Sequence, residues 1–397
     1  TLEQYKGSKL VYGDSIVGDE PLLLQKEDGS ITIKTIETIS NEWNSYEEFK
    51  PFDTNRKEKQ QSITKYKVWA NNKWNIIKRV IRHKTNKSIY RVNTHCGVVD
   101  VTEDHSLLNE NSEKLKPTEC IINETKLLQS FPTFNSKSIT LYEIMDILDK
   151  YETYNRSFEE KKAFVDGMFY GDGSCGMYNC PSGKKYSWAL NNQNKKLLNM
   201  CKNYLSEVYN FNDFKILETM KSSSVYKLVP KGSIKKMVNI FRPVFYDKNK
   251  YKIVPDKILN ADYNIRLQFF LGYYAADGAK ARNSKTKNIR FDNKGKIGSA
   301  QLYYLVKSLG YKASIRIRKD KLNIYRISCC AIQRKPSNIL KKMIKLRESN
   351  DEEFVYDLET VDGQFQAGVG EIIVKNTDSV FINFKDYLVK KHGELTN

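Results

Sequence analysis

The sequence contains no apolar run long enough to cross a membrane, and its N-terminus lacks the pattern of a signal peptide. A soluble intracellular protein is therefore expected. Cysteine is sparse: the seven cysteines are odd in number, and the spacing of Cys175 and Cys180 is not the usual spacing of zinc ligands. Reduced thiols are expected, and neither a disulfide scaffold nor redox control is indicated.

Acidic residues are nearly absent from Lys280 to Arg347, where 20 Lys or Arg stand against Asp292 and Asp320. This excess of 18 accounts for most of the net charge of +19. Bases alternate with apolar residues at 314–319 and 322–328, which predicts strands with one basic face. Such a sheet face is suited to nucleic acid. The predicted DNA contacts are Arg290, Arg316, Arg318, Lys319, Lys321 and Arg326.

Two stretches near the chain ends form a recognisable motif when they are joined. Lys9-Leu-Val-Tyr-Gly-Asp14 precedes Ser15, and Thr377-Asp-Ser-Val-Phe381 follows Asn376. Without Ser15 to Asn376, two apolar arms flank a Gly-Asp-Thr-Asp turn, a hairpin that presents two carboxylates to metal ions. The joined string resembles the catalytic palm motif of family B DNA polymerases, and a viral polymerase is expected. The 362 residues between the arms resemble an intein, a protein that excises itself and ligates its flanks.

This resemblance implies a mixed fold, in which an all-β, horseshoe-like splicing (Hint) domain is split by an α+β endonuclease domain. The residues themselves are β-rich to about 130, show helical periodicity from about 141, and return to β character at 354. The expected segments are listed in chain order: polymerase flank 1–14, splicing domain 15–135, endonuclease 136–347, splicing domain 348–376 and polymerase flank 377–397.

A similar helix occurs twice, as Ala163-Phe-Val-Asp-Gly-Met-Phe-Tyr-Gly-Asp-Gly173 and as Phe269-Phe-Leu-Gly-Tyr-Tyr-Ala-Ala-Asp-Gly278. The strands and helix that follow each copy also match, over a unit of about 105 residues. These helices resemble the two motifs of LAGLIDADG homing endonucleases, which implies a pseudo-two-fold duplication. A mid-helix glycine costs about 1 kcal/mol against alanine, and close contact of two helices at Gly167 and Gly272 would justify it.

The LAGLIDADG resemblance also implies the chemistry of the helix ends. Asp172 and Asp277 would lie side by side and hold Mg²⁺ ions at two scissile phosphates. Family members commonly add a lysine near each metal site, and Lys252 is the candidate here, with a solvated surface lysine as its alternative. The expected substrate is duplex DNA that encodes the uninterrupted polymerase motif, bound through base and phosphate contacts.

The intein resemblance implies a set of splicing residues. Ser15 would attack the carbonyl before it, helped by Thr102 and His105, which stand in the expected Thr-x-x-His block. Thr377 would then attack the resulting ester, and Asn376 would cyclise and cut its own peptide bond. No cofactor is expected for splicing.

Two positions depart from the intein pattern. Lys375 stands where a histidine usually precedes the terminal Asn, and Asp362-Gly-Gln-Phe365 lacks the usual upstream histidine. Lysine has a pKa of about 10.4 and is a poor proton shuttle at neutral pH unless it is buried. Lys375 could instead donate a hydrogen bond to the Asn376 carbonyl, and Asp357 matches the acidic position of the block as a partner or base.

Alternatives remain open. The nuclease could be inactive in a chain that still splices. The chain could also be a basic nucleic-acid-binding, maturase-like protein without self-processing, although that function does not use Ser15 or Asn376. Expected partners are double-stranded DNA and the polymerase flanks in cis, with no membrane contact; a monomer is expected, in the cytoplasm, the nucleus or a viral replication site.

Overall fold

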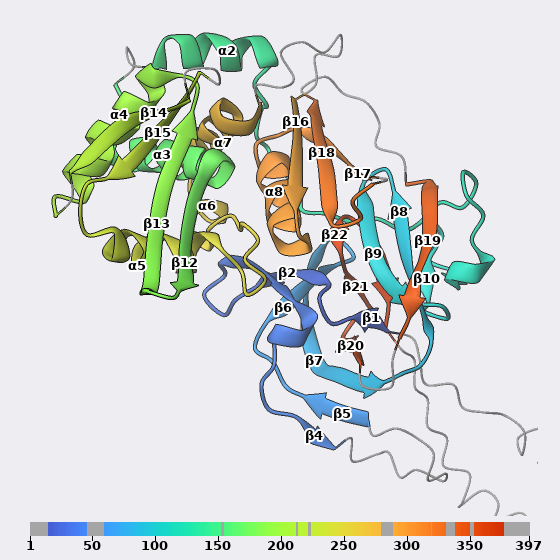
Figure 1. The fold of residues 1–397 in the computed structure, drawn as a ribbon. Helices are drawn as coiled ribbons and strands as arrows, with labels where there is room; N and C mark the ends of the chain where they lie inside the picture. The colour runs from blue at the N-terminus through green and yellow to red at the C-terminus, as the bar shows by residue number, and fades with distance from the viewer. Residues whose placement is uncertain are drawn as a thin grey trace, which may run out of the picture.

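The computed structural model describes most of the chain between the two junctions (Figure 1). The described residues are 15–45, 59–151, 155–211, 213–220, 224–278, 289–318, 320–330, 338–349 and 353–376. The polymerase flanks 1–14 and 377–397, and with them Thr377, lie outside this part, as does Lys319. Among the described residues, no helix has the length and apolar character needed to span a bilayer.

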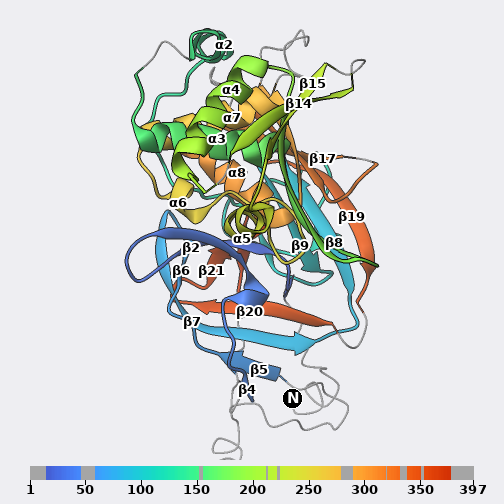
Figure 2. The same ribbon diagram turned by 60° about the vertical axis from the view of Figure 1, so that its left-hand side comes forward.

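A twelve-stranded antiparallel sheet includes β4, β5, β7 and β20 at the bottom of Figure 2 and β8, β9 and β19 along its right-hand side. Its main path runs β19-β8-β9-β1-β20-β7-β6-β2-β3, with β22 on β9 and the pair β4 and β5 on β7. The strands are β1 (Ile16–Val17), β2 (Pro21–Gln25), β3 (Ile31–Thr35), β4 (Asn44–Ser45), β5 (Lys59–Ser62), β6 (Lys67–Ala70), β7 (Lys73–Lys84), β8 (Ser88–Thr94), β9 (Gly97–Thr102), β19 (Leu340–Glu348), β20 (Phe354–Thr360) and β22 (Val369–Gly370). The 3-10 helix η1 (Ile36–Thr38) follows β3.

Both sequence ends of the described chain contribute to this sheet. β1 lies between β9 and β20, with Ile16 opposite both Val101 and Tyr356. β19 pairs with β8, although the sequence analysis counted residues up to 347 with the endonuclease. Residues 340–347 of the predicted endonuclease segment thus belong to a strand of the large sheet. β19 lies at the edge of the large sheet.

A second, four-stranded sheet carries the C-terminal junction. Its order is β11-β10-β23-β21, with bounds β10 (Leu107–Leu108), β11 (Lys114–Leu115), β21 (Gln364–Gln366) and β23 (Ile373–Lys375). The 3-10 helix η2 (Pro117–Glu119) follows β11. Leu107 lies opposite Val374, so the strand after His105 pairs with the strand before Asn376.

The inserted residues contain one series of elements twice. The first series is α3 (Phe158–Asp172), β13 (Gly183–Asn192), α4 (Lys195–Val208), β14 (Phe214–Met220) and β15 (Val225–Pro230). The second is α7 (Tyr263–Asp277), β16 (Ile289–Lys294), α8 (Lys296–Ser308), β17 (Lys312–Ile317) and β18 (Ile324–Cys330). The strand order β13-β15-β14 in one sheet matches β16-β18-β17 in the other. The remaining elements are β12 (Gly173–Cys180), which pairs with β13, α2 (Leu141–Asp149), α5 (Ile234–Phe245) and α6 (Asp256–Leu259).

The helices α3 and α7 lie between the two small sheets and approach each other at their glycines (Figure 1). A Cβ added at Gly167 would lie 2.0 Å from the carbonyl oxygen of Phe269, and one added at Gly272 would lie 2.0 Å from that of Phe164. At Gly171 an added Cβ would lie 2.4 Å from Cβ of Ala276. The predicted close approach of the two helices at Gly167 and Gly272 is thus confirmed, because no larger residue fits at either position.

Two hydrophobic cores match this division. One fills the twelve-stranded sheet with aliphatic residues such as Val99, Val101 and Leu358. The other is rich in aromatic residues, lies around α3, α7 and α8, and extends to Leu23 and Val369 of the large sheet. Most residues of α8 are buried, which shows that this helix is enclosed rather than laid on a surface. Figure 1 shows α8 near the centre of the molecule, and it contacts β2, β3 and β22 of the large sheet as well as β16, β17 and β18.

Candidate active sites

The N-terminal junction is buried against the end of β9. Ser15 is fully buried, and its backbone N–H donates to Oγ1 of Thr102 at 3.3 Å. The backbone N–H of Thr102 donates to the Ser15 carbonyl oxygen at 2.9 Å, and that of His105 donates to the Thr102 carbonyl oxygen at 3.0 Å. His105 is also fully buried. The nitrogen that would leave during an acyl shift is therefore the atom that Thr102 contacts.

The C-terminal junction contacts the residues that follow Thr102 and His105 in the chain. The N–H of Lys375 donates to the Ser106 carbonyl oxygen at 3.0 Å, and the N–H of Asn376 donates to the Gly363 carbonyl oxygen at 3.0 Å. A Cβ added at Gly363 would lie 2.8 Å from Nζ of Lys375 and 3.4 Å from Oδ1 of Asn376. The Asn376 side chain is buried, and its Oδ1 accepts no hydrogen bond from the described residues. The Lys375 amine and the Asn376 side-chain amide, which would cyclise, therefore both lie next to Gly363.

Residues 102–106 connect the two junctions, since Thr102 contacts Ser15 and Ser106 contacts Lys375. Asp357 is buried on β20, and its carboxylate accepts from the N–H of Leu358 at 2.7 Å. Its neighbour Tyr356 pairs with Ile16 beside Ser15, so Asp357 lies on a strand next to the N-terminal junction.

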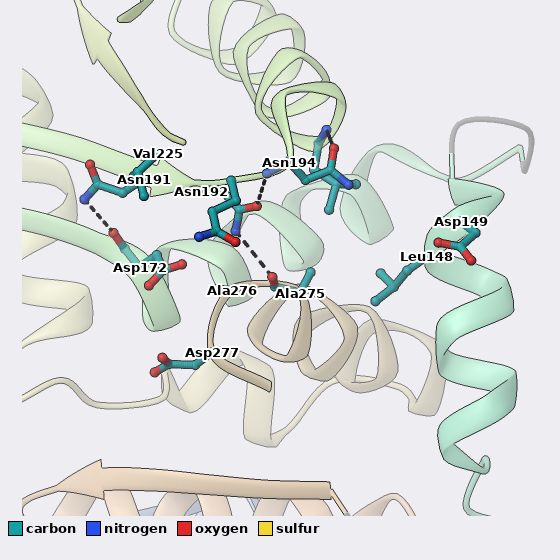
Figure 3. Close-up of a pocket in the computed structure, with 12 residues that line it drawn as sticks. Leu148, Asp149, Asp172, Asn191, Asn192, Asn194, Val225, Ala275, Ala276 and Asp277 are labelled. Atoms are coloured by element: carbon teal, nitrogen blue, oxygen red, sulfur yellow. Dashed lines mark hydrogen bonds between the residues drawn. The ribbon is translucent and has the colours of Figure 1, made fainter. Parts of the chain in front are cut away.

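The predicted acidic pair lies at the ends of α3 and α7. Asp172 and Asp277 line one cavity of about 460 Å³, shared with Asn191 and Asn192 of β13. Figure 3 shows the two carboxylates at adjacent helix ends, with the asparagines on the strand beside them. Nδ2 of Asn191 donates to the Asp172 carbonyl oxygen at 3.2 Å, and Nδ2 of Asn192 donates to the Ala275 carbonyl oxygen at 3.3 Å. The two asparagines thus hold both helix ends at one cavity.

Lys252 lies at the end of α3. Its Nζ donates to the carbonyl oxygens of Phe169 at 3.0 Å and Gly171 at 2.8 Å. Burial lowers the pKa of Lys252 to about 8, although the negative charges of Asp277 and Asp172 act in the opposite direction. The alternative of a solvated surface lysine is therefore wrong. A buried amine near two carboxylates is a candidate proton-transfer group.

The acidic pair fits a hard divalent cation. Mg²⁺ is commonly bound by one or two carboxylates together with substrate phosphates and water, and Asp172 and Asp277 supply that number. Among the described residues there is no group of three or more His, Cys, Asp or Glu side chains that could hold a metal ion. The pair would therefore hold its metal together with DNA, and the metal would supply Lewis acidity at the phosphate.

The predicted basic face is present on the sheet β16-β18-β17. Arg290 and Arg316 are exposed, whereas the alternate residues Phe291, Ile315 and Ile327 are buried beneath them. The remaining predicted DNA contacts on this side are Arg326 opposite Arg316, and Arg318 and Lys321 beyond the strand ends.

Acidic neighbours neutralise part of this basic face. Arg326 forms a bidentate pair with Asp292, at 2.7 Å for each bond. Arg318 pairs with Asp320 in the same way, with its Nε 3.0 Å from Oδ1. Arg290 and Arg316 are therefore better placed than these two arginines to bind phosphate.

Sequence reasoning missed three contributors to these sites. Asn191 and Asn192 end β13, and the corresponding pair Asp292-Asn293 in the second copy was the available signal. Gly363 lies in the segment that lacks the usual upstream histidine and has a φ of +70°, so that the chain turns there against Lys375. No sequence pattern indicated that contact.

Comparisons with known proteins place the chain among related sequences. Residues 264–339 match the family model of the LAGLIDADG-like domain. The DNA polymerase of Acanthamoeba polyphaga mimivirus is 49% identical over 400 residues, which cover 99% of this chain and 22% of the polymerase. The DNA polymerase of Thermococcus hydrothermalis is 24% identical over 305 residues, which cover 73% of this chain and 17% of that protein. The chain thus spans about a fifth of the length of these curated relatives.

Among solved structures, the homing endonuclease I-DmoI in complex with DNA and Mn aligns with a TM-score of 0.34 at 17% identity, over 44% of this chain and 91% of that chain. The matched residues show that this chain contains a LAGLIDADG-like domain, and its sequence is similar to a segment of DNA polymerases. These findings confirm the recognition of the chain as an intein-type insertion in a DNA polymerase that carries an embedded LAGLIDADG endonuclease domain.

Proposed function

We propose that the chain catalyses its own excision, releasing residues 15–376 and joining Asp14 to Thr377. The supporting observation is that residues 102–106 hydrogen-bond both the Ser15 junction and the residue before Asn376. Two distant peptide bonds that must break in order are thus brought to one loop. A purely nucleic-acid-binding protein has no use for this arrangement.

In the first step, the Ser15 hydroxyl oxygen attacks the Asp14 carbonyl carbon, the C–N bond breaks, and the amine is protonated. Thr102 orients the departing nitrogen, which donates to its Oγ1, and His105 supplies the proton. The Thr377 hydroxyl then attacks the ester carbonyl and releases the Ser15 oxygen. The Hint-type, horseshoe-like fold and the domain segments predicted from the sequence belong to this proposal.

In the last steps, the Asn376 side-chain nitrogen attacks its own carbonyl carbon, and the Thr377 nitrogen leaves as an amine. Lys375, held at Gly363 beside the Asn376 side chain, stabilises the developing negative charge. An oxygen-to-nitrogen acyl shift at Thr377 restores an amide. Asp357 serves as the acidic partner or base of this block.

The splicing proposal is tested by expressing residues 1–397 and measuring intact masses. The expected products are a fragment of residues 15–376 and a ligated peptide of 35 residues, since 14 and 21 residues flank the junctions. An undivided chain of 46.2 kDa over a range of temperature and pH would refute the proposal.

We further propose that the inserted segment, as a pseudo-two-fold duplication, cleaves both strands of DNA that encodes the uninterrupted polymerase motif. Asp172 and Asp277 at one cavity would hold Mg²⁺, and Lys252 would transfer a proton from the attacking water. Arg290 and Arg316 would bind the backbone, while Lys319 remains a predicted contact. Incubation of purified protein with that duplex and Mg²⁺ tests the proposal; intact DNA in the presence of normal splicing would leave only the nuclease-inactive alternative.

A further inference from the structure

The helix α8 belongs to the inserted nuclease segment, yet its charged residues contact both splicing junction strands. At its N-terminal end, Lys296 Nζ lies 2.6 Å from an Asp19 carboxylate oxygen and 2.8 Å from one of Asp100, and it also pairs with Glu20. The side chains of Glu20 and Asp100 are almost completely buried, with 1% and 3% exposed. A buried cation from the nuclease segment therefore neutralises carboxylates of the splicing fold.

These two carboxylates lie near the N-terminal junction, Glu20 in the connection between β1 and β2 and Asp100 on β9. Glu20 follows Ser15 by five residues on the β1 side, and Asp100 precedes Thr102 by two residues on β9. Between them Ile16 pairs with Val101, and Ser15 contacts Thr102. Lys296 thus joins the connection that follows β1 to β9, and the pairing of β1 with β9 brings the Ser15 nitrogen to Thr102.

The C-terminal half of α8 makes a similar contact with the other junction. The Tyr303 hydroxyl donates to Oε1 of Glu371 at 2.7 Å, and Lys307 Nζ lies 2.8 Å from the same oxygen. Glu371 precedes Asn376 by five residues and connects β22 with β23. Tyr303 is fully buried, so this contact is part of the interior.

We propose that α8 is a positioning element for splicing, in which Lys296 aligns the Ser15 junction while Tyr303 and Lys307 align the Asn376 junction. The inference rests on the proposed splicing function and adds to it that residues of the nuclease segment are needed for the reaction. Each end of the helix acts on one junction, so substitutions at its two ends should affect different steps.

The N-terminal step is measured in the full chain with Asn376→Ala, where hydroxylamine cleaves the ester formed at Ser15. Adding Lys296→Met should slow this cleavage by about tenfold, because Glu20 is left buried without its cation. Adding Glu20→Gln to Lys296→Met should restore most of the rate. As a matched control, Lys231→Met removes an exposed ion pair with Asp213 in the first repeat and should leave the rate unchanged.

The C-terminal step is measured in the full chain with Ser15→Ala, by the appearance of the fragment that begins at Thr377. Tyr303→Phe removes one hydroxyl group and is expected to fold; it should slow this release by at least about threefold. Lys296→Met should change C-terminal release by less than about twofold. A general loss of folding would instead slow both junctions together, so the step-specific pattern separates positioning from stability.

Equal slowing of both steps by Lys296→Met, or unchanged rates in both Lys296→Met and Tyr303→Phe, would overturn the inference. If Lys296→Met does not yield folded protein, Tyr303→Phe alone decides, and an unchanged C-terminal rate overturns it. A parent chain that shows no processing would refute the proposed splicing function itself. A parent that splices alongside unaffected variants would refute only the role of α8.

Discussion

The closest approach in the nuclease segment, at Gly167, provides a quantitative test of the helix pair. In Gly167→Ala the new Cβ would lie 2.0 Å from the Phe269 carbonyl oxygen, whereas ordinary contact begins at 3.4 Å. The helices α3 and α7 would have to separate by about 1.4 Å at this position. Alanine gains about 1 kcal/mol in helix propensity, but overpacking costs about 1–3 kcal/mol and is occasionally larger. Net destabilisation of up to about 2 kcal/mol is expected.

The effect on cleavage should exceed the effect on stability. Asp172 lies on the same helix, five residues beyond Gly167, and a misplacement of about 1 Å can cost about 100-fold in rate. Thermal unfolding and DNA cleavage should therefore be measured together, with Asn203→Ala on the exposed face of α4 as the control that raises helix propensity without a new contact. If Gly167→Ala matches the parent in both melting temperature and cleavage, the close helix contact does not set the carboxylate geometry.

Three further predictions concern single side chains. Lys252→Met should lower DNA cleavage by about 100-fold, and the parent rate should rise between pH 7 and 9 as the amine, with its pKa of about 8, loses its proton; matching pH profiles of parent and variant would contradict this role. Lys375→His should preserve or speed C-terminal cleavage measured by mass, since imidazole titrates near neutral pH; abolished cleavage would show a specific role for the lysine. Arg316→Ala should weaken DNA binding and lower the salt slope by about one, as measured in a salt titration, and an unchanged slope would argue against a phosphate contact.

Patterns within short stretches of sequence could be predicted, and contacts between distant stretches could not. The helix glycines and the alternation of Arg316 with buried Ile315 follow from local periodicity, and the structure confirms both. The strand Leu340–Glu348 is also rich in lysine and arginine, but its partner β8 lies far away in the chain, so its charge could not show that it pairs with the large sheet. The contact of Lys296 with Glu20 spans 276 residues, and no sequence period encodes it.

The position of α8 also bears on how the two proposed activities can be lost. Gly298 in its first turn packs against the Lys252 backbone, where an added Cβ would lie 2.2 Å from the Lys252 carbonyl oxygen. Oε1 of Gln301 accepts from the N–H of Val254 at 2.9 Å, which fixes the same segment. One helix therefore supports the nuclease lysine on one side and both splicing junctions on the other.

Loss of the nuclease carboxylate should consequently be separable from loss of the nuclease fold. Asp277→Asn leaves α8 and its contacts with Glu20 and Glu371 in place, so DNA cleavage should disappear while the rate of splicing stays within about twofold of the parent rate, with the two rates measured on one preparation. Splicing that fails together with cleavage in Asp277→Asn would show that the acidic pair, and not α8, links the two units. If splicing survives in Asp277→Asn as expected, selection for splicing alone would continue to act on Lys296 and Tyr303 even after Asp277 had become dispensable.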